Sequence, residues 1–265
     1  LAVLAAGDRQ ALRPLPVSSL ILISPAIRAR GLPSGLVITP RVMSGVSATT
    51  GAFRWLERHE DLDFAKYESF PLNAWFQLVL LDERVAAATR GTLGVPLLGF
   101  VSWDDATTDA AASLKFFRRA ADERSRLSIT ARDSEVPAVT QLAADARISV
   151  RGAAVAERGV VSYSHLSFGI PEANTHYGLA GDYANCVWYP VKGGRGSAKY
   201  CNCLTAAMHD SACPDHEPAS GDALRYGEAN PTDQRQYVLR RLTFNPRFDT
   251  DVRAIGDFID EASRR

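Results

Sequence analysis

The stretch VPLLGFVSW (Val95–Trp103) decides the fold, and the residues after it continue its pattern. Its apolar residues run on without alternation, which is typical of a strand buried on both faces of a parallel sheet. In Asp104–Ser125, Thr107 or Thr108 can cap a helix with apolar residues at helical spacing, and RLSIT (Arg126–Thr130) supplies the next strand. A strand, a helix and a strand with short joints form a βαβ unit, so the sequence predicts an α/β fold with a mostly parallel sheet flanked by helices.

Other segments fit the same class. SSLILISPAI (Ser18–Ile27) is an apolar run that predicts another buried strand. ARISVRGAAV (Ala146–Val155) and RGVVSYSHLSF (Arg158–Phe168) predict further extended segments. The tail Asp249–Arg265 predicts a helix that packs on the sheet, capped by Asp249 or Thr250, and its expected apolar face consists of Val252, Ile255, Phe258 and Ile259.

An insertion, residues 28–94, separates the first two predicted strands and is too long for a simple crossover. Its second half, Tyr67–Arg90, has apolar residues on successive turns, with Pro71 near the start and Gly91 after the end, which indicates a helical cap over the sheet edge. Aromatic side chains here suit the cap's own core or the wall of an apolar pocket, and we expect most to be core: Phe53, Trp55, Phe64, Tyr67, Phe70, Trp75 and Phe76.

Composition excludes several classes of protein. The 265 residues are 46% hydrophobic and 23% charged, which fits one folded domain over residues 1–265 and excludes wholesale disorder. Basic and acidic residues number 30 each, so no positive surplus exists to bind nucleic acid. The longest apolar runs, such as Leu20–Ile23 and Leu78–Leu81, are far shorter than the roughly 20 residues of a membrane helix, so we expect no transmembrane segment.

The four cysteines lie in a segment rich in Gly, Asp, Cys and Pro, residues 178–230, which we expect to be a surface excursion. They are Cys186, Cys201, Cys203 and Cys213. An even count fits one or two disulfides, which would indicate a periplasmic or secreted protein, whereas free thiols would fit the cytoplasm. With His209 the cysteines could bind zinc, but they lack the paired C-x2-C spacing of structural zinc sites.

Two positions follow predicted strands at the edge where a parallel sheet gathers functional groups. Asp104 and Asp105 come directly after VSW, and His165 follows VVSYS. A carboxylate can orient a histidine and stabilise its imidazolium while the histidine takes a proton from a serine or cysteine. Alone, either carboxylate could cap the next helix and His165 could be structural, but their order along the chain favours a catalytic pair. His176 is the reserve candidate.

The third member of such a site, the nucleophile, is missing from the sequence. No G-x-S-x-G occurs, and the nearest candidates, Gly31–Gly35 and Met43–Gly45, have the wrong spacing for a nucleophile elbow between a strand and a helix. The apolar start LAVLAAGDRQAL (Leu1–Leu12) has no capping residue before it, so we expect a helix that is cut by the start of the sequence.

Five segments together resemble the serine-hydrolase branch of the α/β-hydrolase superfamily, near monoglyceride lipase-like and lysophospholipase-like esterases: SLILISPAI, YESFPLNAWFQL, PLLGFVSWDDATTD, VSYSHLSFGIPEANTHYG and LTFNPRFD. The resemblance covers most of the chain from Leu1 to Phe258. It implies the chain order Ser, Asp, His, with the serine and the oxyanion hole a few residues before Leu1. The family's D-x-x-V acid pattern matches Asp105 better than Asp104, although Thr108 replaces the usual Val.

The resemblance implies a serine hydrolase that cleaves carboxylic esters, with Asp105 orienting His165 as the general base and with no cofactor or metal. The aromatic cap suggests an apolar acyl chain, as in a monoacylglycerol or a lysophospholipid. Residues 1–265 alone would lack the nucleophile and be inactive. Two alternatives stay open, a peptidase or amidase of the same fold and a non-catalytic α/β-hydrolase-like binding protein. The sequence predicts neither the acyl length nor the oligomeric state.

Overall fold

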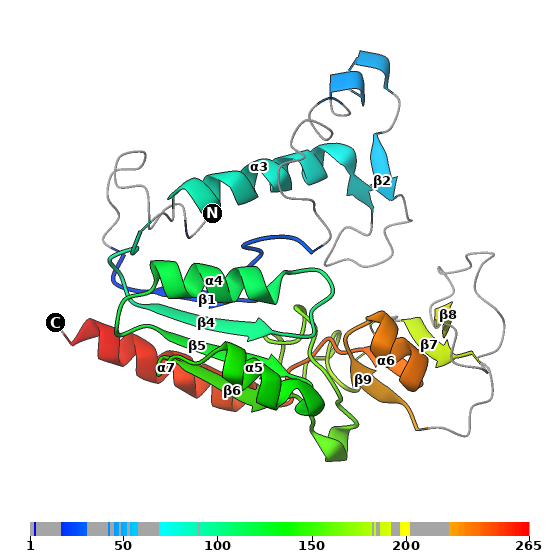
Figure 1. The fold of residues 1–265 in the computed structure, drawn as a ribbon. Coiled ribbons are helices and arrows are strands. Elements are labelled where there is room, and N and C mark those ends of the chain that lie inside the picture. Colours follow the sequence, from blue (N-terminus) through cyan, green and yellow to red (C-terminus); the bar gives the residue numbers. More distant parts are fainter. Residues whose placement is uncertain are drawn as a thin grey trace.

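The computed structural model describes residues 3, 17–30, 42, 45–47, 49–51, 54–57, 69–88, 91–181, 183, 186–191, 197–201 and 223–264. Its centre is a four-stranded parallel sheet in the order β1-β4-β5-β6 (Figure 1). The strands are β1 (Leu20–Ile23), β4 (Leu97–Ser102), β5 (Arg126–Ala131) and β6 (Ile148–Gly152). The predicted α/β class is confirmed, and the predicted βαβ unit is β4, a helix and β5.

All six residues of β4 are buried, because helices and loops cover both faces of the strand. Successive side chains of a strand point to opposite faces. Leu97 and Val101 therefore join one hydrophobic cluster, and Leu98 and Phe100 join another on the opposite face. Between them, Gly99 leaves room for Leu127, since a Cβ at this position would lie 2.7 Å from Leu127 Cδ1.

One face of the sheet is covered by α4 (Ala110–Ala120) and α5 (Val136–Leu142), the latter following the short 3-10 helix η1 (Asp133–Glu135). Leu114 and Phe117 of α4 are buried in this cluster. The prediction that Thr107 or Thr108 caps α4 is wrong. Asp109 occupies the N-cap position, where its carboxylate accepts the N–H of Ala112 at 3.0 Å and satisfies a donor of the first turn.

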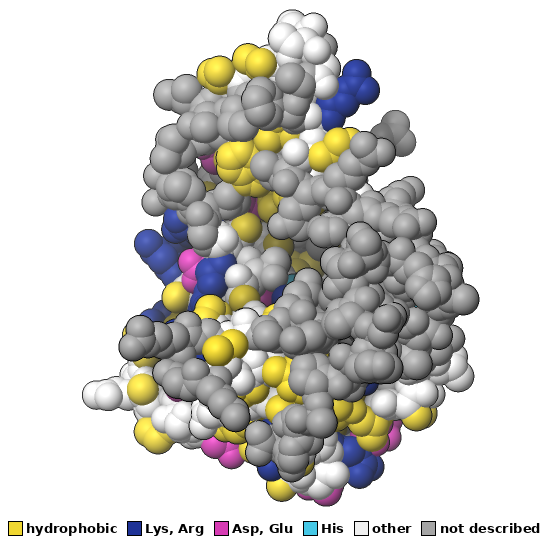
Figure 2. All heavy atoms as spheres, turned by 90° about the vertical axis from the view of Figure 1, so that its right-hand side faces the viewer, with side chains coloured by type: hydrophobic (Ala, Val, Ile, Leu, Met, Phe, Trp, Pro, Cys, Tyr) yellow, Lys and Arg dark blue, Asp and Glu magenta, His cyan; other side chains and the backbone are white. Residues whose placement is uncertain are grey.

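The insertion between β1 and β4 contains β2 (Trp55–Glu57), β3 (Phe70–Pro71) and α3 (Leu72–Ala88). Helix α3 lies on the α4 side of the sheet and contributes Val85 to its core cluster. Of the aromatic residues expected to be core, Trp55 and Phe70 are exposed and two are only partly buried, Trp75 and Phe76. In the view of Figure 2, hydrophobic side chains are visible in the upper part of the molecule. The remaining three lie outside the described residues, namely Phe53, Phe64 and Tyr67.

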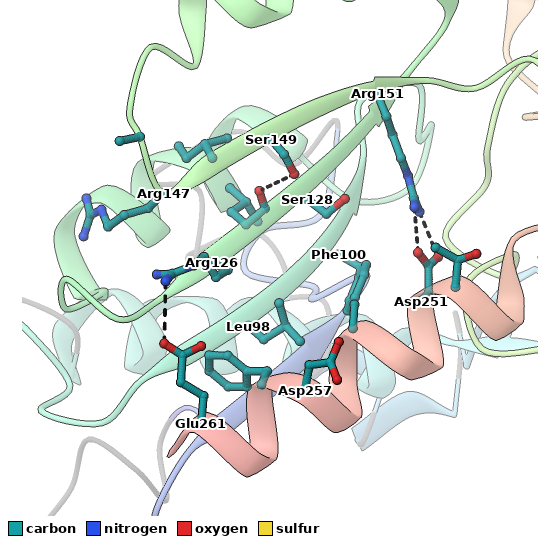
Figure 3. A pocket seen from close by; sticks show the side chains of 16 residues that line it. Leu98, Phe100, Arg126, Ser128, Arg147, Ser149, Arg151, Asp251, Asp257 and Glu261 are labelled. Carbon is teal, nitrogen blue, oxygen red and sulfur yellow. Dashed lines mark hydrogen bonds and ion pairs between the residues drawn. The ribbon is translucent and has the colours of Figure 1, made fainter. Parts of the chain in front are cut away.

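The opposite face of the sheet is covered by α7 (Phe248–Ser263), whose Phe258 packs in the cluster of Leu98 and Phe100. Contrary to the prediction, neither Asp249 nor Thr250 caps the helix, and Val252 and Ile259 are exposed. An ion pair joins the helix to β6. Arg151 Nη1 and Nη2 contact the Asp251 carboxylate at 2.6 and 2.8 Å (Figure 3).

A second, mixed sheet has the order β8-β7-β10-β9. It is built from β7 (Cys186–Pro190), β8 (Ser197–Cys201), β9 (Arg225–Gly227) and β10 (Leu239–Arg241), with α6 (Pro231–Gln236) between the last two. Most of its strands come from the segment expected to be a surface excursion. The backbone of Cys186 lies opposite that of Cys201. The side chains of all four cysteines, and the proposed disulfide or zinc partners, lie outside what the structure describes.

The segment Arg158–Phe168, which follows β6, was expected to be extended, but it forms no strand. The short 3-10 helix η2 (Ala156–Arg158) is followed by a single bridging residue, Val160, and then by turns through Phe168. Of the predicted helix in Leu1–Leu12, the described part is Val3, which is buried in the α4 cluster. Among the described helices, none has the length and apolar character to cross a membrane.

The buried ring of Phe117 provides a test of the packing of α4 on the sheet. Phe117→Ala should lower the free energy of unfolding by about 3–5 kcal/mol, because it leaves a cavity in the closely packed cluster. Urea unfolding at equilibrium measures this change. As a control, Leu142→Ala at an exposed position of α5 should change the free energy by no more than about 0.5 kcal/mol. Equal effects of the two substitutions would contradict the described packing.

Candidate functional site

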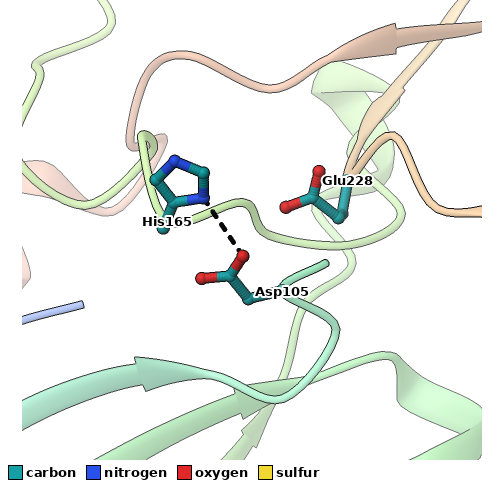
Figure 4. Close-up of side chains that lie close together, drawn as sticks. All are labelled: Asp105, His165 and Glu228. Atoms are coloured by element: carbon teal, nitrogen blue, oxygen red, sulfur yellow. Dashed lines mark hydrogen bonds and ion pairs between the residues drawn. The ribbon is translucent and has the colours of Figure 1, made fainter. Parts of the chain in front are cut away.

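The structure brings Asp105 and His165 together at the carboxyl end of the parallel sheet. His165 Nδ1 lies 3.1 Å from Asp105 Oδ1 (Figure 4). The Asp105 side chain is buried, whereas 23% of the His165 side chain is exposed. One edge of the imidazole therefore meets a buried carboxylate while the ring keeps access to solvent. The pair was predicted from its place after the strands, and the structure gives it the geometry of a hydrogen bond.

The turn after β4 fixes the carboxylate of Asp105. Its Oδ1 accepts the N–H of Thr107 at 2.7 Å, which is an Asx turn, and its Oδ2 accepts the hydroxyl of Thr108. Burial alone would raise the pKa of Asp105, but the hydrogen bonds from His165, Thr108 and Thr107 outweigh it and lower the pKa below its usual value. Asp105 is therefore ionised, and His165 Nδ1 must carry the hydrogen that lies between them.

Asp104 points into a different environment, although only one peptide bond separates it from Asp105. Its buried carboxylate lies 3.6 Å from Arg132 Nη2, and the same guanidinium contacts Asp233 at 2.8 Å. Burial raises the pKa of Asp104 to about 7, because the attraction of Arg132 is offset by the nearby carboxylates of Asp233 and Glu135. Of the two aspartates considered from the sequence, only Asp105 therefore contacts His165.

Buried serine hydroxyls hold the loop that carries His165. Ser164 and Ser167, which flank it, both donate to the carbonyl of Leu242 directly after β10, at 2.7 and 3.1 Å. Ser167 also accepts the N–H of Ser164 at 3.1 Å. These bonds replace the backbone ladder that a strand would have had. The run VVSYS, which was expected to be extended, is thus held by its buried hydroxyls and not by strand pairing.

Tyr163 and Ser102 join this loop to the end of β4. The Ser102 hydroxyl donates to the carbonyl of Tyr163 at 2.7 Å, and both residues are buried. The Tyr163 ring packs against Phe168 with 5.3 Å between the centroids, and burial raises its pKa to about 12. Ser102 precedes Asp105 by three residues and Tyr163 precedes His165 by two. Their hydrogen bond therefore ties the segment that carries Asp105 to the segment that carries His165.

Sequence reasoning missed Glu228, which follows β9 and is fully buried. One ligand atom from each of Asp105, His165 and Glu228 lies within 4.8 Å of the others, and Figure 4 shows the Glu228 carboxylate directed toward the pair. Arg241 binds Glu228 Oε1 through Nε at 3.1 Å and Nη2 at 2.8 Å. No local pattern marks Glu228 in the sequence, because it comes from the second sheet, which the sequence did not predict.

These three residues are the group within the described part of the chain that could hold a metal ion. Their side chains are already engaged in other contacts. Asp105 accepts hydrogen bonds at both oxygens, and Oε1 of Glu228 is paired with the Arg241 guanidinium. The cluster therefore fits a hydrogen-bonded acid–base site better than a cation site.

The reserve candidate, His176, has a structural environment. Its ring packs edge-on against Tyr177 and Tyr183, with centroid distances of 4.4 and 5.6 Å, and its backbone N–H donates to Asn174 Oδ1. The serines of the two nearest nucleophile motifs, Ser34 and Ser44, lie outside the described residues, as do three histidines, His59, His209 and His216. Figure 2 shows a histidine side chain in a recess, with hydrophobic, basic and acidic side chains close to it.

A pocket of about 420 Å³ lies elsewhere, between the sheet and α7 (Figure 3). Arginines from the sheet and acidic residues from α7 line it, and two ion pairs cross it, Arg151 with Asp251 and Arg126 with Glu261. Neither Asp105 nor His165 lines this pocket. It is therefore a groove between packed elements and separate from the candidate site.

Comparisons with known proteins add no family to these observations. No family model matches the sequence, no curated protein matches it, and no solved structure matches it. The contacts of Asp105, His165 and Glu228 themselves therefore indicate the chemistry of the site.

The raised pKa of Asp104 predicts how stability depends on pH. Between about pH 4 and pH 7 the folded protein holds a proton at Asp104 that the unfolded chain has released. Raising the pH through this interval should therefore lower the free energy of unfolding, by up to about 1.4 kcal/mol per pH unit.

Asp104→Asn should remove this part of the pH dependence, so that the variant loses less stability than the wild type between pH 5 and pH 8. Urea unfolding at several pH values measures the difference, with Asp260→Asn, at an exposed position of α7, as the control. Parallel curves for the wild type and Asp104→Asn would contradict the raised pKa.

Proposed function

We propose that this chain belongs to a serine hydrolase of the α/β-hydrolase type that cleaves carboxylic esters, with Asp105 and His165 as its acid and base. The observation that carries the proposal is the 3.1 Å contact between His165 Nδ1 and the buried, ionised Asp105. This contact lies at the carboxyl end of a parallel sheet, where such enzymes assemble their active sites. The chain order of acid before histidine also agrees with that class.

The contacts of Asp105 support a defined role for each nitrogen of His165. Since Nδ1 donates its hydrogen to Asp105, Nε2 is the nitrogen free to accept a proton. In the proposed reaction Nε2 takes the proton of a serine hydroxyl as the serine attacks the ester carbonyl. The imidazolium then gives this proton to the leaving alcohol, and a second cycle with water releases the acid. Asp105 stays ionised throughout and stabilises the imidazolium.

The nucleophile in this proposal is a serine that precedes Leu1 in the natural polypeptide, as the resemblance implies. For the substrate we propose an ester with an apolar acyl chain, such as a monoacylglycerol or a lysophospholipid. The exposed hydrophobic side chains of Trp55 and Phe70 in the insertion support this class.

Substitution of the acid–base pair tests the proposal. In the full-length natural protein, His165→Ala should lower kcat/KM for a p-nitrophenyl acyl ester about 10²–10⁴-fold, because general base catalysis is lost. Asp105→Asn should also lower it strongly, since the amide cannot balance the imidazolium charge. His176→Ala is the matched control and should keep the wild-type rate. A wild-type rate in His165→Ala would remove the assignment.

Covalent labelling locates the nucleophile. A fluorophosphonate probe should label one serine of the full-length protein, and His165→Ala should slow the labelling, because the hydroxyl is activated by His165. Mass spectrometry of the labelled peptide is expected to place the serine before Leu1. Labelling of a serine within residues 1–265 would disprove that placement. Absence of both labelling and ester hydrolysis would favour a non-catalytic binding protein, and hydrolysis of amides alone would favour a peptidase.

A further inference from the structure

The buried carboxylate of Glu228 is not explained by the acid–base pair alone. It is fully buried, and it lies beside Asp105 and His165 although it comes from the second sheet. A buried carboxylate normally has hydrogen-bond partners for both oxygens, because leaving one unpaired costs free energy. The way in which the two oxygens of Glu228 are used therefore indicates what the residue does.

The hydrogen bonds that the Glu228 carboxylate accepts from the described residues all fall on one oxygen. Oε1 accepts from Arg241 Nε and Nη2 and from the N–H of Ala229, the last at 2.7 Å. Oε2 is buried and has no hydrogen-bond partner among the described residues. An arginine that served only to neutralise Glu228 could bind both oxygens in the usual two-pronged geometry. Here both hydrogen bonds from Arg241 to Glu228 go to Oε1, and Oε2 is left for the site.

The position of Glu228 relative to His165 is fixed through Ser162. The backbone N–H of Glu228 donates to Ser162 Oγ at 2.8 Å, and this hydroxyl donates to Asp233 Oδ2 at 2.6 Å. Ser162 belongs to the same buried loop as His165. The second sheet and the histidine loop are thus joined at this point, and the Glu228 carboxylate faces the Asp105–His165 pair (Figure 4).

We propose that Glu228 is a positioning residue for the protonated form of His165. This inference rests on the proposed function. When Nε2 of His165 takes the proton of the nucleophile, the ring gains a positive charge, while the hydrogen on Nδ1 stays between His165 and Asp105. Glu228 gains no proton and forms no covalent bond. Its negative charge acts on the imidazolium from a second side and holds the ring in place during the reaction.

This role predicts an effect on turnover rather than on substrate binding. The imidazolium exists only after the proton has moved, so the charge of Glu228 stabilises the transition state more than the bound substrate. In the full-length protein, Glu228→Gln should lower kcat about tenfold and leave KM within about a factor of two. Glu228→Asp keeps the negative charge but places it farther from His165, because the side chain is shorter. Its kcat should lie between those of the wild type and Glu228→Gln.

Asp251→Asn on α7 is the matched control, because it also breaks the pair of a buried carboxylate with an arginine, here Arg151 of β6. It should lower the unfolding temperature and leave kcat unchanged. If Glu228→Gln and Asp251→Asn changed kcat equally, Glu228 would be a structural ion-pair partner and the inference would fail. If Glu228→Gln did not fold, Glu228→Asp would decide alone, since a wild-type kcat in that variant would overturn the inference.

Two further outcomes separate the inference from its premise. A wild-type rate in His165→Ala overturns the proposed function, whatever Glu228→Gln does. Loss of activity in His165→Ala together with a wild-type kcat in Glu228→Gln overturns only the role of Glu228. Dialysis of the wild-type protein against a chelator should leave kcat unchanged, and a loss of activity that Zn²⁺ restores would instead make Glu228 a metal ligand.

Discussion

Burial of β4 on both faces is the constraint on which the rest of the structure depends. A strand that meets no water on either side needs helices above and below it, and α4 and α7 meet that need through side chains that alternate along the strand. Strand β4 ends at Ser102, at the carboxyl end of the parallel sheet. Asp104 and Asp105 lie in the turn that follows, where their side chains enter different surroundings, one beside Arg132 and the other beside His165.

The candidate site combines this rigid strand end with parts that are not strands. His165 lies on a loop fixed by serine hydroxyls, and Glu228 follows a strand of the small second sheet, most of which comes from the segment rich in Gly, Asp, Cys and Pro. Ser102 and Ser162 connect these parts, the first to the carbonyl of Tyr163 and the second to the backbone of Glu228. The acid–base geometry is therefore the product of contacts between residues far apart in the sequence.

The sequence predicted the parts of this structure that have a local pattern. The apolar runs at β1, β4 and β5 and the spacing of α4 lead directly to a parallel sheet. The end of β4 led to Asp105, and the run VVSYS led to His165 although it forms no strand. The prediction failed where the contacts of a side chain differ from those that the local sequence pattern suggests. Thr108 binds Asp105 and leaves the N-cap to Asp109, and Val252 and Ile259 are exposed although their spacing fits a buried face. Glu228 was missed because its partners, Arg241 and Ser162, are set by the second sheet.

The loop around His165 also bears on how freely this protein can change its sequence. A strand in the core accepts exchange among hydrophobic side chains of similar volume, since its backbone bonds do not depend on side-chain identity. The loop has the opposite property, because its shape depends on the hydroxyls of Ser164 and Ser167, which reach a single carbonyl at Leu242. Only another small hydroxyl side chain could replace them without leaving that carbonyl unpaired in the interior. The least regular part of the fold is thus the part with the narrowest choice of residues.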